Sequence, residues 1–290
     1  MDEVESIARC MALFAGTPDV QLVQTGLRKK IVDAWGIRPG ARILEIGCGQ
    51  GDLTAVLAHV VGSEGRVMAF DLAASDYGAP LTIGESTEYL HRSPLGSRID
   101  FHLGCDVLSA ENAFPDDSFD YVVLAHCSWY FDSIDRLRRT LIRIRPWARQ
   151  LCLSEWDLIP QEMSQLAHLL SVLAQGQVEA FRNESTSNIR TPITKNALEG
   201  LLRDTGWEEI VASTVDSSGL QDAQWEIGEC IRSTVENAID GGLPSRFLDF
   251  VRTEVGILKE VADVHGRKSL PSFAILAKRS VPCTGAEALR

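Results

Sequence analysis

Between residues 40 and 157 of this 290-residue chain, short apolar segments alternate with amphipathic ones, and this rhythm constrains the fold more than any other feature. The segment 121–125, Tyr-Val-Val-Leu-Ala, is apolar without alternation, as expected of a strand covered by helices on both faces. Alternating strands and helices are typical of a parallel sheet. The elements expected here are strands 42–46, 66–70, 98–103, 119–125 and 150–155, with helices 51–61 and 132–143.

The rest of the chain is expected to complete the sheet. One or two helices within residues 4–34 precede the first strand, and a helix that Thr194 can cap stops at Gly206. Two further strands, 208–215 and 272–278, then close the sheet. The predicted fold class is α/β, with a doubly wound, mostly parallel seven-stranded sheet, an antiparallel last strand and helical lid insertions.

Two insertions interrupt the C-terminal half of this pattern. In 161–190 and 222–265, apolar residues recur at helical spacing, so both are expected to form amphipathic helices. They are natural lid material over a ligand site, although packing alone would explain their apolar faces equally well. We therefore divide the chain into N-terminal helices forming part of the lid at 1–39, a core at 40–160, and the remaining sheet with its capping insertions at 161–290.

The charge balance argues against a nucleic-acid partner. Forty acidic and 28 basic side chains give a net charge of −12, and such a surface repels a polyanion. The basic residues gather at one place, where they share a predicted helix with Leu137, Leu141 and Ile144, and this spacing favours a solvated helix face over a binding patch. The cluster consists of Arg136, Arg138, Arg139, Arg143 and Arg145.

Neither a membrane segment nor a metal site is expected. No run approaches the roughly 18 apolar residues of a membrane-spanning helix, and the N-terminus lacks the basic start of a signal peptide, so we expect a cytoplasmic protein with no membrane partner. The cysteines form no CxxC pair and their number is odd, which argues against a disulfide framework or a zinc site. We expect reduced thiols and small core residues at Cys10, Cys48, Cys105, Cys127, Cys152, Cys230 and Cys283.

A glycine-rich turn follows the first predicted strand, at Gly47, Gly49 and Gly51. Glycine lets the backbone approach a ligand closely because it has no Cβ and tolerates positive φ. In this GxGxG spacing, Asp52 stands where the dinucleotide fingerprint needs its third glycine, and no phosphate-binding lysine follows, so NAD and nucleoside triphosphates are disfavoured. Tight structural turns also use glycine, so the turn alone leaves its ligand open.

Two acidic residues after the next strands add weight to this turn. Asp71 ends the second strand, where a carboxylate can accept two hydrogen bonds from a ribose diol. Asp106 follows the third strand and can accept a hydrogen bond from an exocyclic adenine amine. Each acid alone also fits a cap or turn. Ligands of open sheets bind outside the carboxyl ends of the strands, where the turn and both acids fall, so the ordered set favours an adenosine ligand.

In this order the motifs resemble those of class I S-adenosylmethionine-dependent methyltransferases, over roughly residues 40–157. The resemblance implies a Rossmann-like cofactor core, S-adenosylmethionine as cofactor and S-adenosylhomocysteine as product. It also implies that Glu45 and the glycine loop hold the methionine part, Asp71 the ribose and Asp106 the adenine. The cofactor-binding residues expected are Glu45, Gly47, Cys48, Gly49, Gly51, Asp71, Leu72, Asp106, Val107 and Ala125.

The resemblance continues beyond the cofactor loop, with one departure. The stretch 114–120, Phe-Pro-Asp-Asp-Ser-Phe-Asp, is similar to the family's approach to its fourth strand, and 141–146 to its approach to the fifth. Trp147 and Ala148 stand where the family usually has a glycine pair. This difference concerns a turn and leaves the cofactor loop unaffected.

The acceptor side is expected at 126–130, His-Cys-Ser-Trp-Tyr, which follows the fourth strand. His126 is a candidate base or orienting group, and Trp129 and Tyr130 can stack on a flat acceptor or contact the sulfonium by cation–π attraction. These aromatic residues fit a core under the next helix equally well. The segment 155–157, Glu-Trp-Asp, borders the same cleft or forms a turn. We take His126 and Tyr130 as the candidate catalytic residues, although methyl transfer needs mainly positioning and a dedicated base is optional.

The sequence thus favours in-line methyl transfer to an oxygen, nitrogen or sulfur atom of a small molecule, by a monomer or homodimer. The acidic surface and the helical insertions favour a metabolite as the acceptor. A protein methyltransferase with a more open cleft is one alternative. The other is a non-methylating protein that binds S-adenosylmethionine as a sensor or as an aid to a rearrangement.

Overall fold

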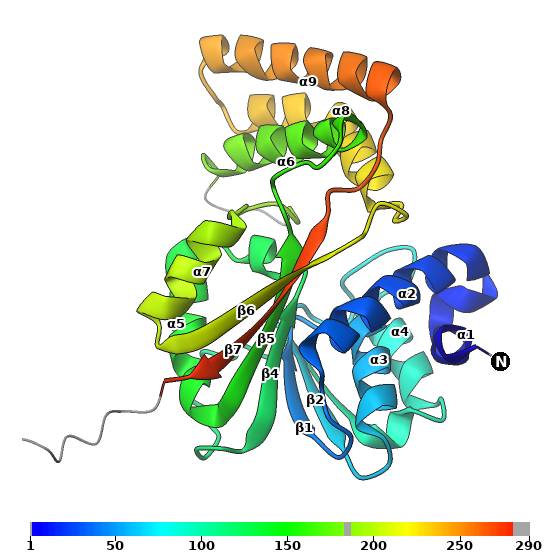
Figure 1. Cartoon of the computed structure of the whole chain (residues 1–290). Coiled ribbons are helices and arrows are strands. Elements are labelled where there is room, and N and C mark those ends of the chain that lie inside the picture. The colour runs from blue at the N-terminus through cyan, green and yellow to red at the C-terminus, as the bar shows by residue number, and fades with distance from the viewer. Residues whose placement is uncertain (1, 183–186, 281–290) are drawn as a thin grey trace, which may run out of the picture.

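The computed structural model describes residues 2–182 and 187–280, with one seven-stranded sheet at its centre (Figure 1). The strands lie in the order β3-β2-β1-β4-β5-β7-β6. Strands β1 to β5 pair in parallel, whereas β7 is antiparallel to both its neighbours. The predicted fold class and all the predicted strands are therefore confirmed. The strands are β1 (Arg42–Ile46), β2 (Arg66–Asp71), β3 (Ile99–Leu103), β4 (Phe119–Ala125), β5 (Ala148–Trp156), β6 (Trp207–Val215) and β7 (Ser272–Arg279).

Helices cover both faces of this sheet, which explains the uninterrupted apolar run of β4. Figure 1 shows α2 (Pro18–Trp35) and α3 (Asp52–Val61) beside one face, and α5 (Ile134–Ile144) and α7 (Lys195–Asp204) beside the other. Residues on successive positions of β4 point to opposite faces. Val122, Val123 and Leu124 are nevertheless each at most 1% exposed, as a two-sided covering requires.

Local sequence signals explain where several helices begin and end. Helix α2 begins at Pro18, whose fixed φ suits a first helical turn, and ends at Gly36, which has a φ of 64°. Helix α7 begins after Thr194, whose side chain accepts a hydrogen bond from the Ala197 backbone as predicted. The short α1 (Glu3–Ala8) precedes α2 and packs on it.

Helix α4 (Ile83–His91), between β2 and β3, was not predicted. A capping box starts it: the Thr82 hydroxyl accepts from the Glu85 backbone, and the Glu85 carboxylate accepts from the Thr82 backbone. This Thr-x-x-Glu signature is legible in the sequence. The apolar stripe of α4 is too short to show a clear helical period, so only the cap marks it.

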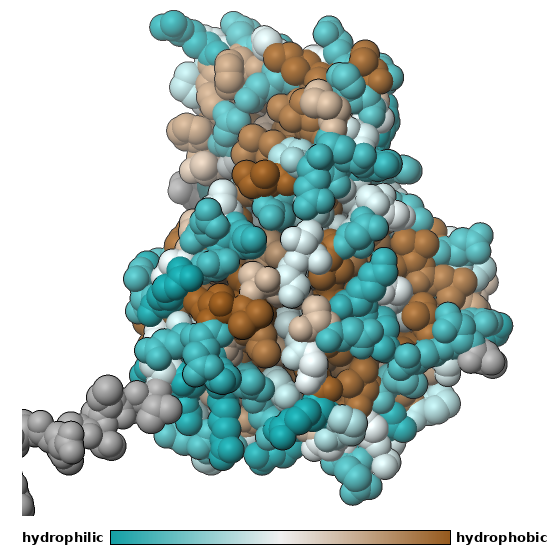
Figure 2. Space-filling view, viewed as in Figure 1, coloured by the Kyte–Doolittle hydropathy of each residue, from teal (hydrophilic) through white to brown (hydrophobic). Residues whose placement is uncertain are grey.

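The two insertions form a separate three-helix bundle of α6 (Leu166–Glu179), α8 (Asp222–Asp240) and α9 (Ser245–His265). Figure 1 shows this bundle above the carboxyl ends of the parallel strands. It has an apolar core of its own, in which Ile227, Cys230, Val251 and Leu258 are fully buried. The helices predicted in both insertions are thus confirmed. In Figure 2 apolar residues also reach the outer surface of the bundle.

The predicted solvated face of the arginine cluster is only partly correct. Arg136 is 27% exposed at its side chain and forms a 2.9 Å ion pair with Asp106. Arg138 lies 3.6 Å from a carboxylate oxygen of Asp204. Both arginines thus bind acids of their own chain, Arg136 one in the loop that follows β3 and Arg138 one at the end of α7.

Within the described ranges, no helix is long and apolar enough to cross a membrane. The six cysteines of the described residues are free thiols, and five of them are buried. Cys283 lies outside the described residues.

Candidate functional site

The predicted cofactor residues converge at one edge of the sheet. In the pairing register, Ile46 at the end of β1 lies opposite Phe70 of β2 and Leu124 of β4. The loops that follow these strands are therefore neighbours. They bring together the glycine turn after β1, Asp71 and Leu72 after β2, and Ala125 with the segment that follows β4.

The glycine turn has the backbone conformation that the sequence predicted. Gly47, Gly49 and Gly51 have φ values of 78°, 52° and 91°, a region that other residues rarely adopt. A Cβ at Gly47 would lie 2.7 Å from the Cβ of Cys127, and one at Gly51 would lie 2.9 Å from Leu90. A Cβ at Gly49 would meet no atom within 4 Å. Packing against Cys127 therefore requires glycine at position 47, whereas at Gly51 the Leu90 side chain could move and the positive φ is the stronger constraint. Gly49 borders open space where a ligand can approach the backbone.

Asp71 is tied directly to this turn. One carboxylate oxygen accepts a hydrogen bond from the Gly49 backbone N–H at 2.8 Å, and the other accepts from the Ala73 N–H at 2.8 Å. A carboxylate oxygen has two lone pairs, so each retains one acceptor position. Two parallel acceptors of this kind fit the two hydroxyls of a ribose. Leu72 beside it is 59% exposed, which provides an apolar surface next to the same position.

Glu45 is a buried carboxyl group beneath the turn. It is 2% exposed and accepts a 2.7 Å hydrogen bond from the Thr54 hydroxyl. The pKa of Glu45 is raised to about 8, mainly by burial. The hydrogen bond from Thr54 opposes this rise, and the nearby carboxylates of Asp71 and Asp52 add to it. A buried acid among other acids favours a cation, such as the α-ammonium of a methionine moiety. Cys48 follows in the turn, and burial raises the pKa of its thiol as well, so it stays a neutral side chain.

Asp106, the predicted adenine acceptor, already has partners on both oxygens. One oxygen accepts from the Leu108 N–H at 2.9 Å, and the other lies 2.9 Å from the Arg136 guanidinium. The side chain is 37% exposed, so the second lone pair of each oxygen remains reachable. Val107, next in the chain, is 7% exposed and packs in the main core.

His126 directly follows β4 and is held in an unusual conformation. Its φ is 47°, in the left-handed region where histidine occurs more often than most residues. Its Nε2 lies 3.1 Å from Ser272 Oγ, and its ring lies 4.9 Å from that of Trp156. The pKa of His126 is lowered to about 3, mainly by burial and also by the positive charge of Arg28. At neutral pH the imidazole is therefore uncharged.

The turn after His126 is held by a buried acid. The backbone N–H and hydroxyl of Ser128 both donate to Glu155 Oε2, at 3.1 and 2.7 Å. Burial raises the pKa of Glu155 to about 7, against the lowering by these hydrogen bonds. Trp129 is 4% exposed and belongs to the main core, so the interpretation as a core residue holds for it. The segment 155–157 thus includes one residue that supports this turn.

Tyr130 differs from Trp129 because it faces the bundle. Burial raises the pKa of Tyr130, and the carboxylates of Glu226 and Glu155 raise it further. Glu226 belongs to α8, so the bundle approaches the end of β4 closely enough to act on this hydroxyl.

Helix α2 connects the cofactor turn to the bundle. Gln21 donates a 2.8 Å hydrogen bond to Asp52, which opens α3 directly after the glycine turn. One turn later, Gln24 donates a 2.7 Å hydrogen bond to Asp222, at the start of α8. These contacts were not predicted, because no local signal marks a pair of residues far apart in the chain. Only the spacing of the two glutamines by three residues, on one helix face, hints at a shared role.

Three comparisons with known proteins agree with this geometry. A family model described as protein-L-isoaspartate (D-aspartate) O-methyltransferase matches residues 19–76. The chain is 29% identical to the ubiquinone/menaquinone biosynthesis C-methyltransferase of Vibrio parahaemolyticus, over 61% of this chain and 68% of the relative. The solved structure of a cyclopropane-fatty-acyl-phospholipid synthase-like protein from Lactobacillus casei superposes with a TM-score of 0.86 at 34% identity, over 95% of this chain and 98% of that one. The chain belongs to the class I S-adenosylmethionine-dependent methyltransferases. S-adenosylmethionine is its cofactor, as the sequence predicted.

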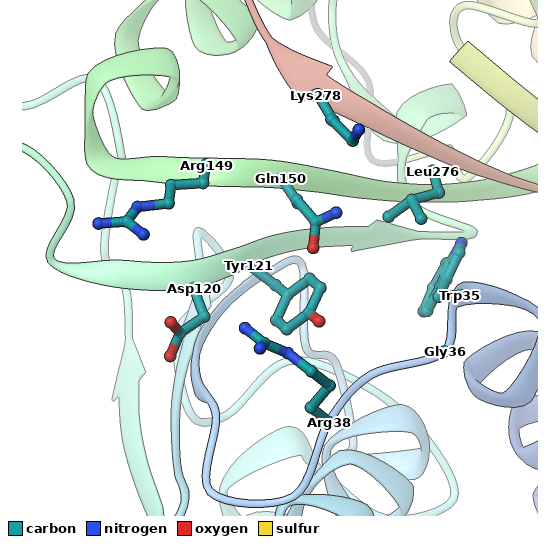
Figure 3. Close-up of a pocket in the computed structure, with 9 residues that line it drawn as sticks. All are labelled: Trp35, Gly36, Arg38, Asp120, Tyr121, Arg149, Gln150, Leu276 and Lys278. Atoms are coloured by element: carbon teal, nitrogen blue, oxygen red, sulfur yellow. The ribbon is translucent and has the colours of Figure 1, made fainter. Parts of the chain in front are cut away.

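A surface pocket of this methyltransferase lies away from the cofactor turn (Figure 3). The pocket has a volume of about 460 Å³. Its lining includes Tyr121, near the start of β4, so it lies toward the amino ends of the parallel strands, whereas the cofactor turn lies at their carboxyl ends. Figure 3 shows the Arg38 guanidinium beside the Tyr121 ring. Two other cations of its rim pair with acids, Arg149 with Asp117 at 3.5 Å and Lys278 with Glu209. The pocket is therefore separate from the methyl-transfer site.

Proposed function

We propose that the methyltransferase holds its cofactor along the carboxyl edge of β1, β2 and β3. The carboxyl group of Glu45 faces the α-ammonium of the methionine part, and the backbone at Gly49 lies against the cofactor. Asp71 accepts both ribose hydroxyls, and Asp106 with Val107 borders the adenine. The hydrogen bond from Gly49 to Asp71 supports this assignment, because it aims the carboxylate along the turn.

We further propose that the acceptor atom is a carbon of a small hydroxylated ring. The sequence favoured an oxygen, nitrogen or sulfur acceptor. The C-methyltransferase names of the Vibrio relatives favour carbon instead; a second of them, from Vibrio cholerae, is 26% identical over 72% of this chain and 82% of its own length. The structural observation that carries the proposal is the place of His126 directly after β4, where Nε2 lies 3.1 Å from Ser272 Oγ and burial lowers the pKa of the ring. A neutral imidazole can accept a hydrogen bond from a ring hydroxyl and so increase the electron density at the ring carbons.

The protein's part in this reaction is mainly positioning. When bound, S-adenosylmethionine supplies a methyl group on a sulfonium, which an electron-rich carbon attacks in line. Such a transfer would form the carbon–carbon bond as the sulfur–methyl bond breaks and S-adenosylhomocysteine leaves, and the hydrogen of the ring carbon would pass as a proton to water when the bundle opens. His126 orients the hydroxyl, Tyr130 borders the ring, and the bundle excludes water from the reacting atoms.

The bundle and the N-terminal helices act as the lid in this proposal. The hydrogen bond between Gln24 of α2 and Asp222 of α8 supports it, since it closes the bundle onto the helix that also contacts the cofactor turn. The division into lid helices at 1–39, a core at 40–160 and capping insertions at 161–290 is part of this proposal.

A fatty-acyl chain is the second candidate acceptor. The Lactobacillus casei protein, whose name points to fatty-acyl phospholipids, resembles this chain over nearly its whole length. A protein acceptor has less support. The family model named for protein substrates matches only the stretch from α2 to the loop after β2, which belongs to the cofactor side.

Transfer of radiolabelled methyl groups tests these proposals. The purified protein is incubated with methyl-labelled S-adenosylmethionine and, separately, with hydroxylated naphthalene and benzene rings, vesicles of unsaturated phospholipid, and a protein lysate. We expect label on ring carbons, in a bond stable to acid hydrolysis. Label confined to phospholipid favours the second candidate, and label on oxygen or on protein contradicts the proposal.

A further inference from the structure

A chain of buried hydroxyl groups leads away from His126. Its Nε2 lies 3.1 Å from Ser272 Oγ, which donates a 3.3 Å hydrogen bond to Ser217 Oγ. Ser217 in turn donates a 2.6 Å hydrogen bond to the carbonyl oxygen of Leu270. Ser217 is 2% exposed and Ser272 is fully buried, so bulk water does not compete with these contacts.

The carbonyl oxygen at the end fixes the direction of every hydrogen bond in this chain. A carbonyl oxygen can only accept, and a serine hydroxyl has a single proton. Ser217 uses its proton on Leu270, so it must accept from Ser272. Ser272 uses its proton on Ser217, so it must accept from His126. The imidazole is uncharged and has one ring proton, which must therefore lie on Nε2.

We propose that Ser217 and Ser272 are positioning residues that hold His126 as the Nε2–H tautomer and leave its Nδ1 lone pair free for the acceptor hydroxyl. Within residues 2–182 and 187–280, no hydrogen bond engages Nδ1. The hydrogen bonds place a proton on Nε2, and the burial of the ring, which lowers its pKa, leaves Nδ1 without one. The role of Nδ1 rests on the proposed function.

The positions of the two serines connect this tautomer to the bundle. Ser217 lies just after β6, before the insertion that contains α8 and α9, and Ser272 begins β7 just after it. Both ends of the insertion thus meet at His126. A third buried serine, Ser269, joins the same two ends separately: it accepts from the Ala223 N–H and donates to the Leu220 carbonyl, each at 3.1 Å. The Ser269 hydroxyl forms its hydrogen bonds with Ala223 and Leu220 and not with Ser217, Ser272 or His126, so its removal is a matched control.

Long-range nitrogen-15 NMR of histidine-labelled protein tests the tautomer without any acceptor. The chain has six histidines, and the signal of His126 is assigned by its loss in His126→Gln. We expect the Nε2–H pattern in the unaltered protein at neutral pH. In Ser217→Ala the Ser272 proton is released to donate to Nε2, so the ring should change to Nδ1–H. In Ser272→Ala no hydroxyl orients the ring proton, so a mixture of the Nε2–H and Nδ1–H tautomers should appear. Ser269→Ala should keep the Nε2–H pattern.

The opposite results would overturn the proposal. An Nδ1–H or charged ring in the unaltered protein contradicts it, as does an unchanged Nε2–H pattern in both Ser217→Ala and Ser272→Ala. Binding of S-adenosylmethionine by calorimetry shows that each variant is folded. If an alanine variant does not fold, Ser217→Thr and Ser272→Thr retain the hydroxyls and should retain the Nε2–H pattern.

Turnover separates this inference from the proposed function. With a ring acceptor found in the methyl-transfer screen, Ser217→Ala and Ser272→Ala should each lower kcat by about tenfold or more, with KM for S-adenosylmethionine unchanged. Ser269→Ala should keep kcat near its original value. If the tautomers change as expected and kcat does not, the role of Nδ1 is wrong; if no ring compound accepts a methyl group, the proposed function fails while the tautomer assignment remains.

Discussion

Asp71 accepts a hydrogen bond from the backbone N–H of Gly49 at 2.8 Å, so the acid that ends β2 and the glycine turn that follows β1 form one unit. The strands on which they stand are neighbours in parallel register. A change at either residue should therefore alter the position of the other, and we expect cofactor binding to depend on both.

Asp71→Ala should weaken the binding of S-adenosylmethionine by roughly 10- to 100-fold, because hydrogen bonds to a charged group contribute about 1.5–3 kcal/mol. It also removes the acceptor that holds the Gly49 backbone. Isothermal titration calorimetry measures the change. The exposed Asp76, in the loop that follows, is the matched control, and Asp76→Ala should leave the affinity unaltered. Equal affinities for the two variants would show that Asp71 does not hold the ribose.

Gly47→Ala should destabilise the fold more than Gly49→Ala in the absence of cofactor. Both positions have positive φ, which costs a non-glycine residue about 1–2 kcal/mol. Only at Gly47 does the new Cβ also collide, at 2.7 Å from the Cβ of Cys127. Urea unfolding gives the two free energies of unfolding. Cys127→Gly in the Gly47→Ala background should recover part of the loss, and a lack of any recovery would contradict the collision as its cause.

Stability should decrease as the pH rises from about 7 to 8.5, and Glu45 should contribute to the decrease together with the buried thiols of Cys48, Cys127, Cys152 and Cys230, whose pKa burial raises. Burial raises the pKa of Glu45 to about 8, far above its value in an unfolded chain. The folded state therefore binds more protons than the unfolded state in this window, and its stability is lost as the pH rises through the folded pKa. His126 and His168, whose pKa values burial lowers to about 3 and about 4, are uncharged in the folded state throughout this window and contribute little to the slope.

Urea unfolding at several pH values in that window measures this slope. Glu45→Gln, which cannot ionise, should reduce the slope below about pH 8, while the contribution of the buried thiols at higher pH remains. Glu155→Gln should have a smaller effect, because the pKa of Glu155 is raised only to about 7 and most of its titration lies below the window. An unchanged slope in Glu45→Gln would contradict the assignment.

Asp222→Ala should raise KM for the acceptor by several fold and leave the affinity for S-adenosylmethionine nearly constant. The change removes the 2.7 Å hydrogen bond by which α8 meets Gln24, so the bundle closes less often. Steady-state kinetics with the identified acceptor, together with calorimetry of the cofactor, provide the two readings. Asp240→Ala, at the exposed far end of α8, is the control. A loss of cofactor affinity with unaltered KM for the acceptor would rule out this role.

The cofactor side was predictable because its signals are local. A strand followed by a turn with positive φ needs glycine, and Gly47, Gly49 and Gly51 are at those positions. Parallel strands align their carboxyl ends, so the place of Asp71 followed from its position at the end of β2. The same reasoning found Asp106, although not the arginine that pairs with it.

The acceptor side was less predictable because long-range contacts build it. Ser217 and Ser272 are ordinary serines in the sequence, and only the pairing of β6, β7 and β5 brings them to His126. Arg136 looked like part of a solvated helix face, since helical periodicity does not show that a neighbouring loop presents Asp106 to that face. The aromatic residues after His126 had two equal interpretations, and burial distinguished Trp129 in the core from Tyr130 beside the bundle.

The bundle of α6, α8 and α9 has an apolar core separate from that of the sheet. Substitutions inside one core are therefore weakly coupled in free energy to those inside the other, as expected for sites with no shared contacts. The preference for an acceptor can then change by substitutions in the bundle, while the residues of the cofactor turn remain the same. Substitutions in the bundle core can therefore alter the acceptor site while leaving the stability of the sheet core nearly unchanged.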